Sequence, residues 1–362
     1  MLVHAIDVTS FRNFANLAVS FAPGANVFFG GNGSGKTNLL EAIYCLCLGR
    51  SQRGLADNVL LRDGCEVYRV AGQVSAGGRN AHVAVAYQRG GKRKVTIDEV
   101  PVRPVELFER FCAVAAGPED SVILSGAPSQ RRLFLDLHLS QHSQSYLKEL
   151  VAYQRALSQK NAALKARMDA TLFDEQLLEY GSSITVRRAA FVKQLRVSAA
   201  PFYRDISDGE PFELQYAPEI EIDPECDDIA LARSAFAKQL AQNRDRELAQ
   251  RTAVVGPHRD DLAIFISGYP ARTHGSQGQW RTAAVALKLA IYQMLKEKRR
   301  MAPLLLLDEI FAELDERRAA ALIDGFGAVE QLFLTAALEP PEPLRARAAR
   351  YRIENGAIVI TS

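Results

Sequence analysis

The sequence has no run of about 18 or more uncharged apolar residues, which a membrane-spanning helix requires. It also lacks an apolar secretory segment at its start, because Asp7, Arg12 and Asn13 interrupt the first apolar residues. Its five cysteines are odd in number and form no C-x-x-C pair, which disfavours disulfides and zinc. We therefore expect a cytoplasmic protein with reduced cysteines and no membrane partner.

The chain lacks a strong charge of either sign. Its 44 Lys and Arg and 42 Asp and Glu leave a net charge of +2. A nucleic-acid partner must therefore bind a local basic patch rather than the field of the whole protein. The pattern contains no internal repeat, no low-complexity tract, no base-reading helix, no aromatic stacking platform and no nuclease metal cluster. Its 362 residues, 48% of them apolar, suffice for one large domain or two moderate ones.

Strand-like and helix-like segments alternate at both ends of the chain, and the middle is helical. Glycine becomes sparse from Ser129 to Arg251, where Leu, Ala, Gln, Arg and Lys recur at helical spacing. The predicted strands are 2–8, 17–21, 26–29, 66–74, 81–87, 93–98, 262–266, 303–307 and 331–335, and the predicted helices are 37–48, 129–165, 172–206, 227–251, 277–298 and 316–326, with 207–225 as a connection. This pattern predicts an α/β domain, 1–128 and 256–362, split by a helical insertion at 129–255.

A glycine-rich loop follows one predicted strand and opens a helix. Its residues Gly30-Gly31-Asn32-Gly33-Ser34-Gly35-Lys36-Thr37 fit G-x-x-x-x-G-K-[ST] in full. Such a loop directs backbone N–H groups and a helix N-terminus at phosphates. We expect Lys36 to reach the β- and γ-phosphates of ATP and the Thr37 hydroxyl to bind Mg²⁺. A chance glycine-rich turn is the alternative, which the flanking strand and helix disfavour.

Two acids end an apolar strand at Leu304-Leu305-Leu306-Leu307-Asp308-Glu309. Buried parallel strands are continuous apolar runs, and acids at their carboxyl ends face the ligand crevice of an open α/β sheet. Asp308 is then the Mg²⁺ carboxylate of Walker B type, and Glu309 is the candidate general base that activates water. Without the phosphate loop, the same pair could simply begin a solvated turn.

A second candidate phosphate-binding element lies before the predicted helix at 277–298. Its residues are Ser276-Gln277-Gly278-Gln279. A serine hydroxyl, a glycine backbone and a helix N-terminus suit phosphate. Since one nucleotide needs one phosphate loop, this element suggests contact with a different γ-phosphate. An ordinary helix N-cap is the alternative.

In this order, the motifs resemble the ABC-type ATPase heads of the SMC class, and within that class the RecF family. The resemblance spans essentially the whole chain. It is supported by Ala312-Glu313-Leu314-Asp315, Phe11-Arg12-Asn13-Phe14, Pro118-Glu119-Asp120, Gly126-Ala127-Pro128-Ser129-Gln130-Arg131-Arg132-Leu133-Phe134-Leu135-Asp136 and Gly256-Pro257-His258-Arg259-Asp260-Asp261. It implies a mixed sheet with helices, an antiparallel β subdomain and an inserted α-helical arm.

The resemblance also implies a composite site, in which ATP lies between the phosphate loop of one subunit and the signature of a second copy. Ser276 and Gly278 would contact the partner's γ-phosphate, and Asp315 would sit at the subunit seam. Arg12 would reach the nucleotide bound at Lys36, the alternative being a surface arginine.

Two positions remain open. Gln73 is a candidate for the glutamine that contacts Mg²⁺ or water in such heads, and a sheet-edge glutamine is the alternative. At Leu334-Thr335-Ala336-Ala337 the chain lacks the histidine that ABC transporters place there. This departure leaves γ-phosphate sensing at Thr335 open and favours slow hydrolysis.

The length of the insertion separates related classes. Lys36 and Ser276 are 240 residues apart (276 − 36), much further than in a transporter ATPase subunit. Proteins with long coiled coils need hundreds of residues between the two halves. The chain instead has room for helices of about 30 residues, or roughly 45 Å. A short arm, as in the RecF family, fits this length.

Basic residues cluster at several places that could bind a phosphate backbone in a salt-sensitive way. Each such cluster alone is more often a solvated face. The clusters are Arg50, Arg53 and Arg62; Lys92, Arg93 and Lys94; Arg131 and Arg132; and Lys296, Lys298, Arg299 and Arg300. The run from Gly256 to Asp261 is either part of a site or a structural corner between arm and head.

The resemblance implies a weak Mg²⁺-dependent ATPase that forms an ATP-induced head-to-head dimer on double-stranded DNA near single-strand gaps. It further implies RecR and RecO as partners, help in loading a recombinase, and roles in DNA replication, repair and the SOS response. Two alternatives stay open. One is a general SMC-like head with another DNA task, and the other is a protein-docking ATPase switch that does not bind DNA.

Overall fold

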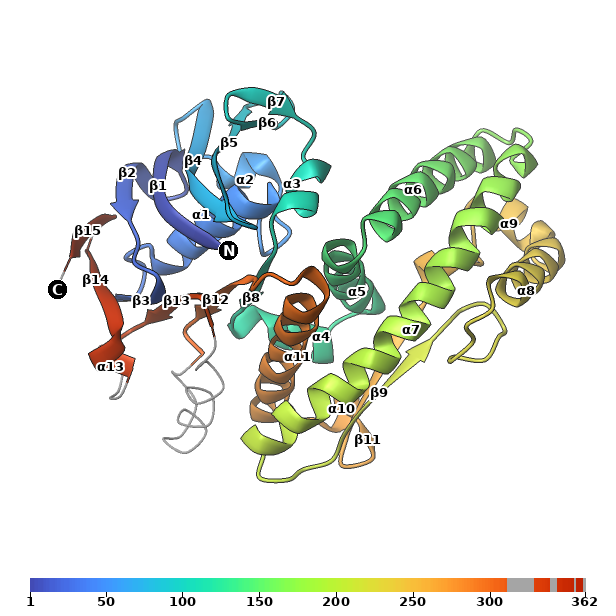
Figure 1. Cartoon of the computed structure of the whole chain (residues 1–362). Coiled ribbons are helices and arrows are strands. Elements are labelled where there is room, and N and C mark those ends of the chain that lie inside the picture. The colour runs from blue at the N-terminus through green and yellow to red at the C-terminus, as the bar shows by residue number, and fades with distance from the viewer. Residues whose placement is uncertain (311–328, 339–343, 355, 361–362) are drawn as a thin grey trace. The chain divides into compact units, whose positions relative to one another are not determined.

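The computed structural model describes residues 1–310, 329–338, 344–354 and 356–360 of the chain (Figure 1). The chain forms two compact units. Unit 1 comprises residues 1–120 and 291–362, and unit 2 comprises 121–290. Among the described helices, none is long and apolar enough to cross a membrane.

The first sheet of unit 1 is antiparallel and six-stranded, with the order β2-β1-β4-β5-β6-β7. Valine and isoleucine alternate with polar residues along its long strands, which is typical of a sheet with one buried face. Its strands are β1 (Leu2–Phe11), β2 (Phe14–Ser20), β4 (Val67–Ala76), β5 (Arg79–Gln88), β6 (Lys94–Ile97) and β7 (Val100–Val102). The meander predicted from the glycine pairs is confirmed.

The second sheet of unit 1 is also six-stranded, with the order β15-β14-β3-β13-β12-β8. All neighbours in it are parallel except the edge strand β15. Its strands are β3 (Gly24–Phe29), β8 (Ala113–Ala116), β12 (Leu304–Asp308), β13 (Gln331–Ala336), β14 (Ala348–Glu354) and β15 (Ala357–Ile360). Parallel strands end at the same edge, so the loops after β3, β12, β13 and β8 meet there.

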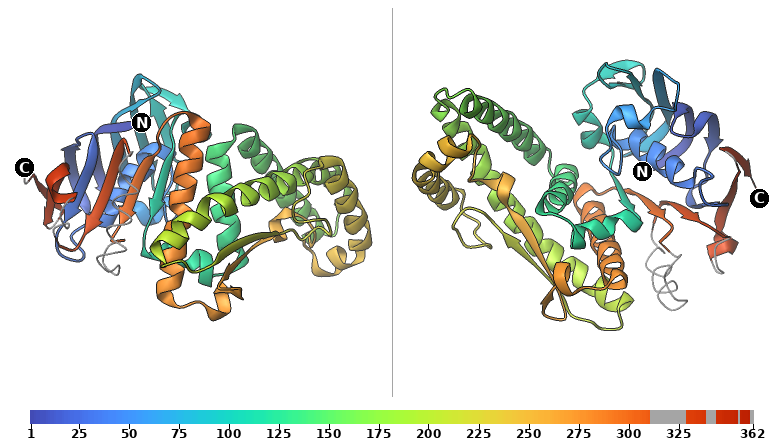
Figure 2. Two further views of the ribbon diagram at one scale, coloured as in Figure 1. Left: turned by 60° about the horizontal axis from the view of Figure 1, so that its bottom comes forward. Right: turned by 180° about the vertical axis from the view of Figure 1, so that it is seen from behind.

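Helix α1 (Lys36–Leu48) lies between the two sheets and is buried along nearly its whole length (Figure 2). Its apolar side chains join those of both sheets in one hydrophobic core. A helix that is apolar all round is suited to this central position. The shorter helices of unit 1 are α2 (Asp57–Leu60), α3 (Val105–Arg110) and α13 (Leu344–Arg347), and the 3₁₀ turn Pro118–Ser121 ends its first segment.

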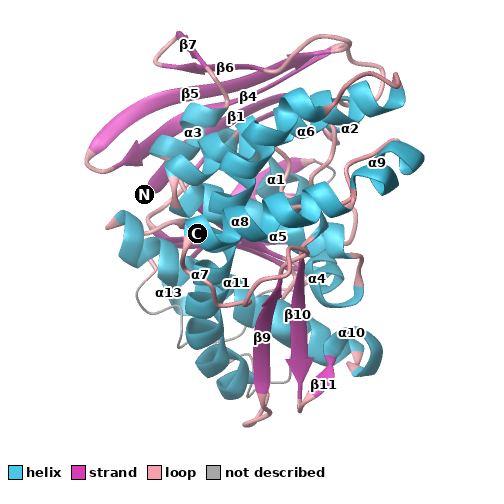
Figure 3. Ribbon diagram, turned by 90° about the vertical axis from the view of Figure 1, so that its right-hand side faces the viewer, coloured by secondary structure: helices cyan, strands magenta, loops and turns pink. Residues whose placement is uncertain are grey.

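Unit 2 is mostly helical and contains a small three-stranded sheet, β11-β10-β9, on which α7 packs (Figure 3). The two long helices α6 and α7 lie side by side. Its elements are α4 (Val122–Ser125), α5 (Pro128–His142), α6 (Gln144–Lys165), α7 (Asp174–Ile206), β9 (Phe212–Ala217), α8 (Ile229–Gln242), α9 (Arg244–Gln250), β10 (Asp261–Ile266), β11 (Tyr269–Pro270), α10 (Ala271–His274) and the first part of α11 (Gln277–Arg299).

The predicted fold class is confirmed, and several element predictions are wrong in detail. The helix predicted at 129–165 is broken at Ser143, whose hydroxyl caps α6 by accepting the N–H of Tyr146. The connection predicted at 207–225 contains β9. Strand β10 pairs with β9, although its pattern had predicted a strand of the resumed α/β domain. Strand pairing across 40 or more residues depends on tertiary contacts, which periodicity does not encode. The helix predicted at 316–326 lies outside the described residues.

The compact units also differ in extent from the predicted insertion at 129–255. Unit 2 begins earlier and ends later because α4 contacts α10, and because β10 pairs with β9. The domain bounds 1–128, 129–255 and 256–362 therefore describe where the sequence pattern changes, and the compact units describe where the packing changes.

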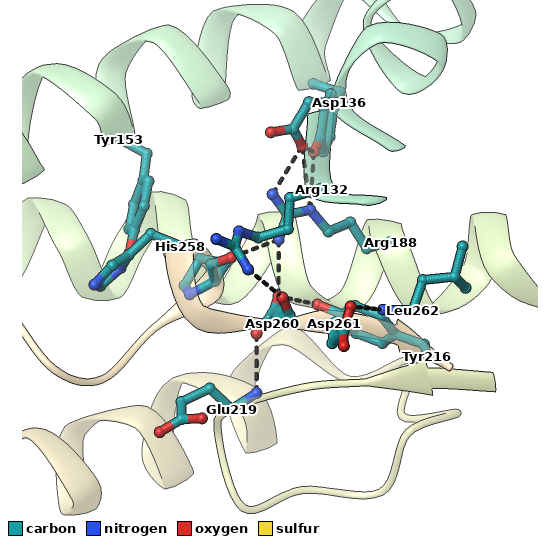
Figure 4. Close-up of polar contacts among 12 residues, drawn as sticks. Arg132, Asp136, Tyr153, Arg188, Tyr216, Glu219, His258, Asp260, Asp261 and Leu262 are labelled. Carbon is teal, nitrogen blue, oxygen red and sulfur yellow. Dashed lines mark hydrogen bonds and ion pairs between the residues drawn. The ribbon is translucent and has the colours of Figure 1, made fainter. Parts of the chain in front are cut away.

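A buried network of charges surrounds Arg188 of α7 (Figure 4). Arg188 is 2% exposed; its Nη2 donates to Asp136 of α5 at 2.8 Å, and its Nη1 donates to Asp260 at 2.8 Å. Nη1 also donates to the carbonyl of Pro257 at 2.6 Å, and Asp260 accepts the backbone N–H of Glu219 at 2.9 Å. Since an unpaired buried charge is very costly, these contacts hold α5, α7 and the loop with Asp260 in one arrangement.

The segment from Gly256 to Asp261 uses its other polar side chains within unit 2 as well. Tyr153 and the Nδ1 atom of His258 share a hydrogen bond of 2.7 Å, and Nε2 lies 3.2 Å from the carbonyl of Ala253. A carbonyl only accepts, so Nε2 carries the proton. Burial lowers the pKa of His258 to about 4, which keeps the ring neutral at pH 7. The Arg131 guanidinium donates two hydrogen bonds, of 2.6 and 2.9 Å, to the Asp261 carboxylate. These contacts favour a structural role for this segment within unit 2.

We predict that Arg188→Met destabilises the protein by about 3–5 kcal/mol, because the buried Asp260 and the partly buried Asp136 would both lose their cation. Equilibrium urea unfolding monitored by circular dichroism measures this. The matched control is Arg196→Met on the same helix, where the side chain is 36% exposed and pairs with Glu225 at the surface. That change should cost less than about 1 kcal/mol. Equal unfolding midpoints for the two variants would contradict the role of the network.

Candidate functional site: a phosphate loop facing two carboxylates

The phosphate loop leaves β3 at Phe29 and enters α1 at Lys36. Two of its glycines are required by geometry. Gly30 has a φ of 150°, and a Cβ there would lie 2.3 Å from the carbonyl oxygen of Ile353. Gly35 has a φ of 112°, and a Cβ there would lie 2.5 Å from Nδ2 of Asn13. Glycine is therefore required at these two positions by backbone conformation and close packing, independently of any contact with phosphate.

The tip of this loop is open, and its lysine is buried beneath it. Gly31, Asn32 and Gly33 are exposed. The side chain of Lys36 is 3% exposed, and its Nζ donates to the carbonyls of Gly30 and Gly31 at 2.9 and 3.1 Å. An ammonium group under an open loop at a helix N-terminus is suited to binding phosphate.

The two predicted carboxylates lie directly across from the loop. Glu309 Oε1 is 3.3 Å from Lys36 Nζ, and Asp308 Oδ1 accepts a hydrogen bond of 2.9 Å from the Thr37 hydroxyl. The pair Lys36 and Thr37 is far in sequence from the pair Asp308 and Glu309, since Thr37 and Asp308 are 271 residues apart. The parallel sheet brings them together at one edge.

Asp308 is almost fully buried, with a side chain 5% exposed. Burial raises the pKa of its carboxyl above the ordinary value, and the nearby Glu119 and Glu309 carboxylates act in the same direction. The hydroxyls of Thr335 and Thr37 oppose this by donating hydrogen bonds. Crowding of like charges around a buried carboxylate is relieved by a cation.

The residues present fit a magnesium ion that is shared with a nucleotide. Mg²⁺ prefers oxygen ligands and usually keeps waters, binding one or two carboxylates together with substrate phosphates. The Thr37 hydroxyl and the Asp308 carboxylate supply such oxygens side by side. In the described part of the chain, no group of three or more His, Cys, Asp or Glu side chains could hold a metal by itself.

Glu309 adopts an unusual backbone conformation. Its φ is 49°, in the left-handed region that residues other than glycine rarely adopt. Such strain persists only where surrounding contacts hold it, and it is concentrated at functional sites. Here the N–H of Glu309 donates to the Thr335 hydroxyl at 2.9 Å, and its side chain remains 32% exposed. The backbone of Glu309 is thus held in place, and its side-chain carboxylate remains accessible to solvent.

Two residues near Asp308 were missed as site residues by the sequence analysis. The Arg53 guanidinium donates to Glu119 at 2.7 Å and lies 4.0 Å from Asp308 Oδ2. Arg53 had been grouped with a basic DNA cluster, and Glu119 belongs to a family motif that carried no role. Strand β8, which brings Glu119 to this edge, was not predicted. The motif Pro118-Glu119-Asp120 was the signal that could have revealed it.

Arg12 lies beside α1 and is held by protein groups. Its Nε donates to the buried Glu41 at 2.8 Å and its Nη1 to the carbonyl of Val59 at 3.1 Å. The neighbouring Asn13 donates to the carbonyl of Ser34 in the phosphate loop at 3.2 Å. The turn that holds Arg12 is therefore attached to the loop, and contact of Arg12 with nucleotide stays a prediction.

Gln73 lies within β4, opposite Ala5 in β1 and His82 in β5. It therefore belongs to the antiparallel sheet, whereas the phosphate loop and the carboxylates belong to the parallel one. Strand β4 is an interior strand, so the sheet-edge alternative is wrong for Gln73, and this position favours an ordinary residue within the sheet.

The signature residues lie in unit 2 at the N-terminus of α11. The Ser276 hydroxyl accepts the N–H of Gln279 at 3.2 Å, and the Gln279 side chain accepts the N–H of Ser276 at 2.8 Å, which makes a reciprocal capping box. Ser276, Gln277 and Gly278 are exposed. The N-cap is thus present, and it leaves the helix terminus accessible. Asp315 lies outside the described residues.

Several basic residues offered as DNA contacts are bound to other groups of the protein. Arg93 pairs with Asp57 at 2.7 Å, Arg132 donates to the carbonyl of Asp260, and Arg299 donates to the carbonyl of Glu109. Arg131 and Arg53 are paired as described above. The exposed members of the clusters are Arg53, which is paired with Glu119, and Lys92, Lys94, Lys298 and Arg300.

We predict that Gly30→Ala destabilises the nucleotide-free protein by at least about 1–3 kcal/mol, because the added methyl group meets a backbone carbonyl and the φ is strained. Gly31→Ala is the matched control, since a Cβ there has nothing within 4 Å. It should change the unfolding free energy by less than about 1 kcal/mol. Urea unfolding of both variants measures the difference, and a stable Gly30 variant would contradict the close approach of Ile353.

The chain is similar to known proteins over nearly its whole length. The family model described as RecF/RecN/SMC N terminal domain matches residues 2–340. A DNA replication and repair protein RecF from Lachnoclostridium phytofermentans is 33% identical, with 94% of each chain covered. One from Symbiobacterium thermophilum is 36% identical, with 92% of this chain and 91% of the relative covered.

Solved structures show the same fold. A structure described as the recombination mediator protein RecF-ATP in the RecFOR pathway has a TM-score of 0.91 at 30% identity and covers 99% of this chain and 97% of that one. A head of SMC bound to a domain of ScpA has a TM-score of 0.57 at 15% identity, over 100% of this chain and 97% of that one. The chain therefore belongs to the RecF family of DNA replication and repair proteins, whose fold is that of the ABC-type ATPase heads.

Proposed function

We propose that the protein binds and hydrolyses ATP with Mg²⁺ and uses ATP to pair head to head with a second copy on double-stranded DNA. The observation that carries this proposal is the meeting of Lys36, Thr37, Asp308 and Glu309 at one edge of the parallel sheet. The relative with a solved structure described as RecF-ATP supports ATP as the nucleotide.

In the proposed reaction, each residue of this edge has one task. Lys36 binds the β- and γ-phosphates, and the loop N–H groups hold the phosphate chain. Thr37 and Asp308 hold Mg²⁺, which when bound neutralises charge on the phosphates. Glu309 orients a water and accepts its proton as the water attacks the γ-phosphorus. Its half-exposed carboxylate is accessible to that water.

Dimerisation is proposed from the signature. Ser276, Gln277 and Gly278 are exposed at the start of a long helix, where a phosphate of a second copy's nucleotide is favoured by the helix dipole. ATP bound to one copy would then complete its site with the signature of the other. Arg12 and Asp315 are proposed to contact the nucleotide and the subunit seam, respectively.

DNA binding is proposed to depend on backbone charge rather than on sequence. The exposed Lys92, Lys94, Lys298 and Arg300 are the cluster members that remain suited to phosphates. Family membership supports work in the cytoplasm near single-strand gaps, with RecO and RecR as partners, in recombinational repair, replication and the SOS response. Hydrolysis is proposed to be slow and to release the dimer.

The central test compares wild type with Lys36→Met and Glu309→Gln. Solution mass is measured by light scattering with and without ATP, and duplex binding by anisotropy at two salt concentrations. We expect Lys36→Met to weaken ATP binding by about tenfold to hundredfold and to stay monomeric, because it loses a charged hydrogen-bond donor. Glu309→Gln should bind ATP normally, lower kcat by about 10²–10⁴-fold and remain a DNA-bound dimer.

The outcomes separate the rival functions. If the solution mass and the DNA affinity of all three proteins are the same with and without ATP, the composite-site mechanism is wrong. ATP-dependent pairing without salt-sensitive DNA binding would instead support the protein-docking switch. A stable dimer without ATP, or co-purification with a long coiled-coil partner, would support a general SMC-like head.

A further inference from the structure

Thr335, near the end of β13, contacts both carboxylate residues of the site. It is 0% exposed. Its hydroxyl donates to Asp308 Oδ1 at 2.6 Å and accepts the backbone N–H of Glu309 at 2.9 Å. One buried side chain therefore holds the carboxylate of Asp308 and the main chain of Glu309 together.

The sheet order places Thr335 at this position. Strand β13 lies between β3, which leads into the phosphate loop, and β12, which leads into the carboxylates. In the parallel register Thr335 is beside Asp308 on one side and Phe28 on the other. No other strand of the sheet has both as neighbours, so the end of β13 is the natural place for a group that links loop and carboxylates.

The hydroxyl has little capacity left for a nucleotide. A threonine hydroxyl has one proton to donate and two lone pairs. The proton is directed at Asp308, and one lone pair accepts from Glu309. The remaining lone pair can only accept, and an ionised phosphate has no proton to give. Thr335 could donate to a γ-phosphate only by releasing Asp308.

We propose that Thr335 is a positioning residue that holds Asp308 and Glu309 in their working arrangement and does not itself read the γ-phosphate. This inference rests on the proposed ATPase function of that site. The Thr37 hydroxyl donates to the same Asp308 oxygen at 2.9 Å, so a continuous hydrogen-bonded chain joins α1, β12 and β13. Thr335 also stabilises the left-handed backbone of Glu309, whose φ is 49°.

The test uses Thr335→Val, which keeps the shape and removes the hydroxyl, and Thr335→Ser, which keeps the hydroxyl. The matched control is Thr185→Val in α7, where the threonine is also buried and its hydroxyl has no hydrogen-bond partner within the described chain. Measurements are kcat and KM for ATP, the affinity for a fluorescent ATP analogue with and without Mg²⁺, and thermal unfolding.

We expect Thr335→Val to lower kcat by about tenfold to hundredfold, the size of one lost hydrogen bond to a charged group. Affinity without Mg²⁺ should stay within about twofold, because the phosphate loop is intact, whereas the gain on adding Mg²⁺ should shrink about tenfold. Thr335→Ser and Thr185→Val should behave like wild type in both assays.

Two results would overturn the inference. One is a Thr335→Val protein with wild-type kcat and wild-type Mg²⁺ response. The other is a Thr335→Ser protein as impaired as Thr335→Val, which would assign the effect to packing. Parallel assays of wild type and Glu309→Gln separate this from failure of the proposed function. If wild type does not hydrolyse ATP, the function fails, and the Mg²⁺-dependent affinity still decides the role of Thr335.

Discussion

The hydrogen-bonded chain through Asp308 is the interaction on which the candidate site depends. A carboxylate that is 5% exposed needs donors to compensate for lost water. Thr37 and Thr335 supply these donors from α1 and β13. Protein groups alone therefore link the phosphate loop to the Walker B strand. A change in any of these residues would shift the position of the others. The geometry of the site is therefore a property of the sheet edge as a whole.

Acidic and basic side chains are grouped around Asp308. Asp308, Glu309 and Glu119 lie close together, and Lys36 and Arg53 lie among them. Burial and like charges raise the pKa of Asp308, which is the behaviour expected where a divalent ion and phosphates complete the balance. Each charged side chain of the site therefore has a neighbour of opposite charge.

Unit 2 is held together by a different principle. Its buried Arg188 joins α5, α7 and the segment from Gly256 to Asp261, and neutral His258 packs beside Tyr153. Buried ion pairs contribute less net stability than apolar packing, but breaking them is costly, so they specify a single arrangement. Many arginines that looked suited to DNA serve such internal contacts. The surface available to a phosphate backbone is consequently narrower than the number of basic residues suggests.

Local patterns in the sequence were sufficient to predict the glycine-rich loop between a strand and a helix, the apolar strand that ends in Asp308 and Glu309, the helix N-cap at Ser276 and the antiparallel meander. Each depends on residues adjacent in the chain, where glycine sterics, capping and period-two alternation act directly. Family resemblance added the ABC-type head, and the composite site that it implies stays a prediction. The same local signals also led to errors, because Ser143 ends a helix by capping the next one and β10 finds its partner in β9.

Only the tertiary structure decided which of these groups meet. The sequence left γ-phosphate sensing at Thr335 open, and the contacts of Thr335 with Asp308 and Glu309 became visible once β13 was seen between β3 and β12. Arg53 moved from a candidate DNA cluster to the neighbourhood of Asp308, and Arg188 gained importance although no motif marked it. The physical reason is common to all three. Strand order and side-chain pairing are set by packing between segments that are not adjacent in the sequence, and the local pattern of residues does not encode which of these segments meet.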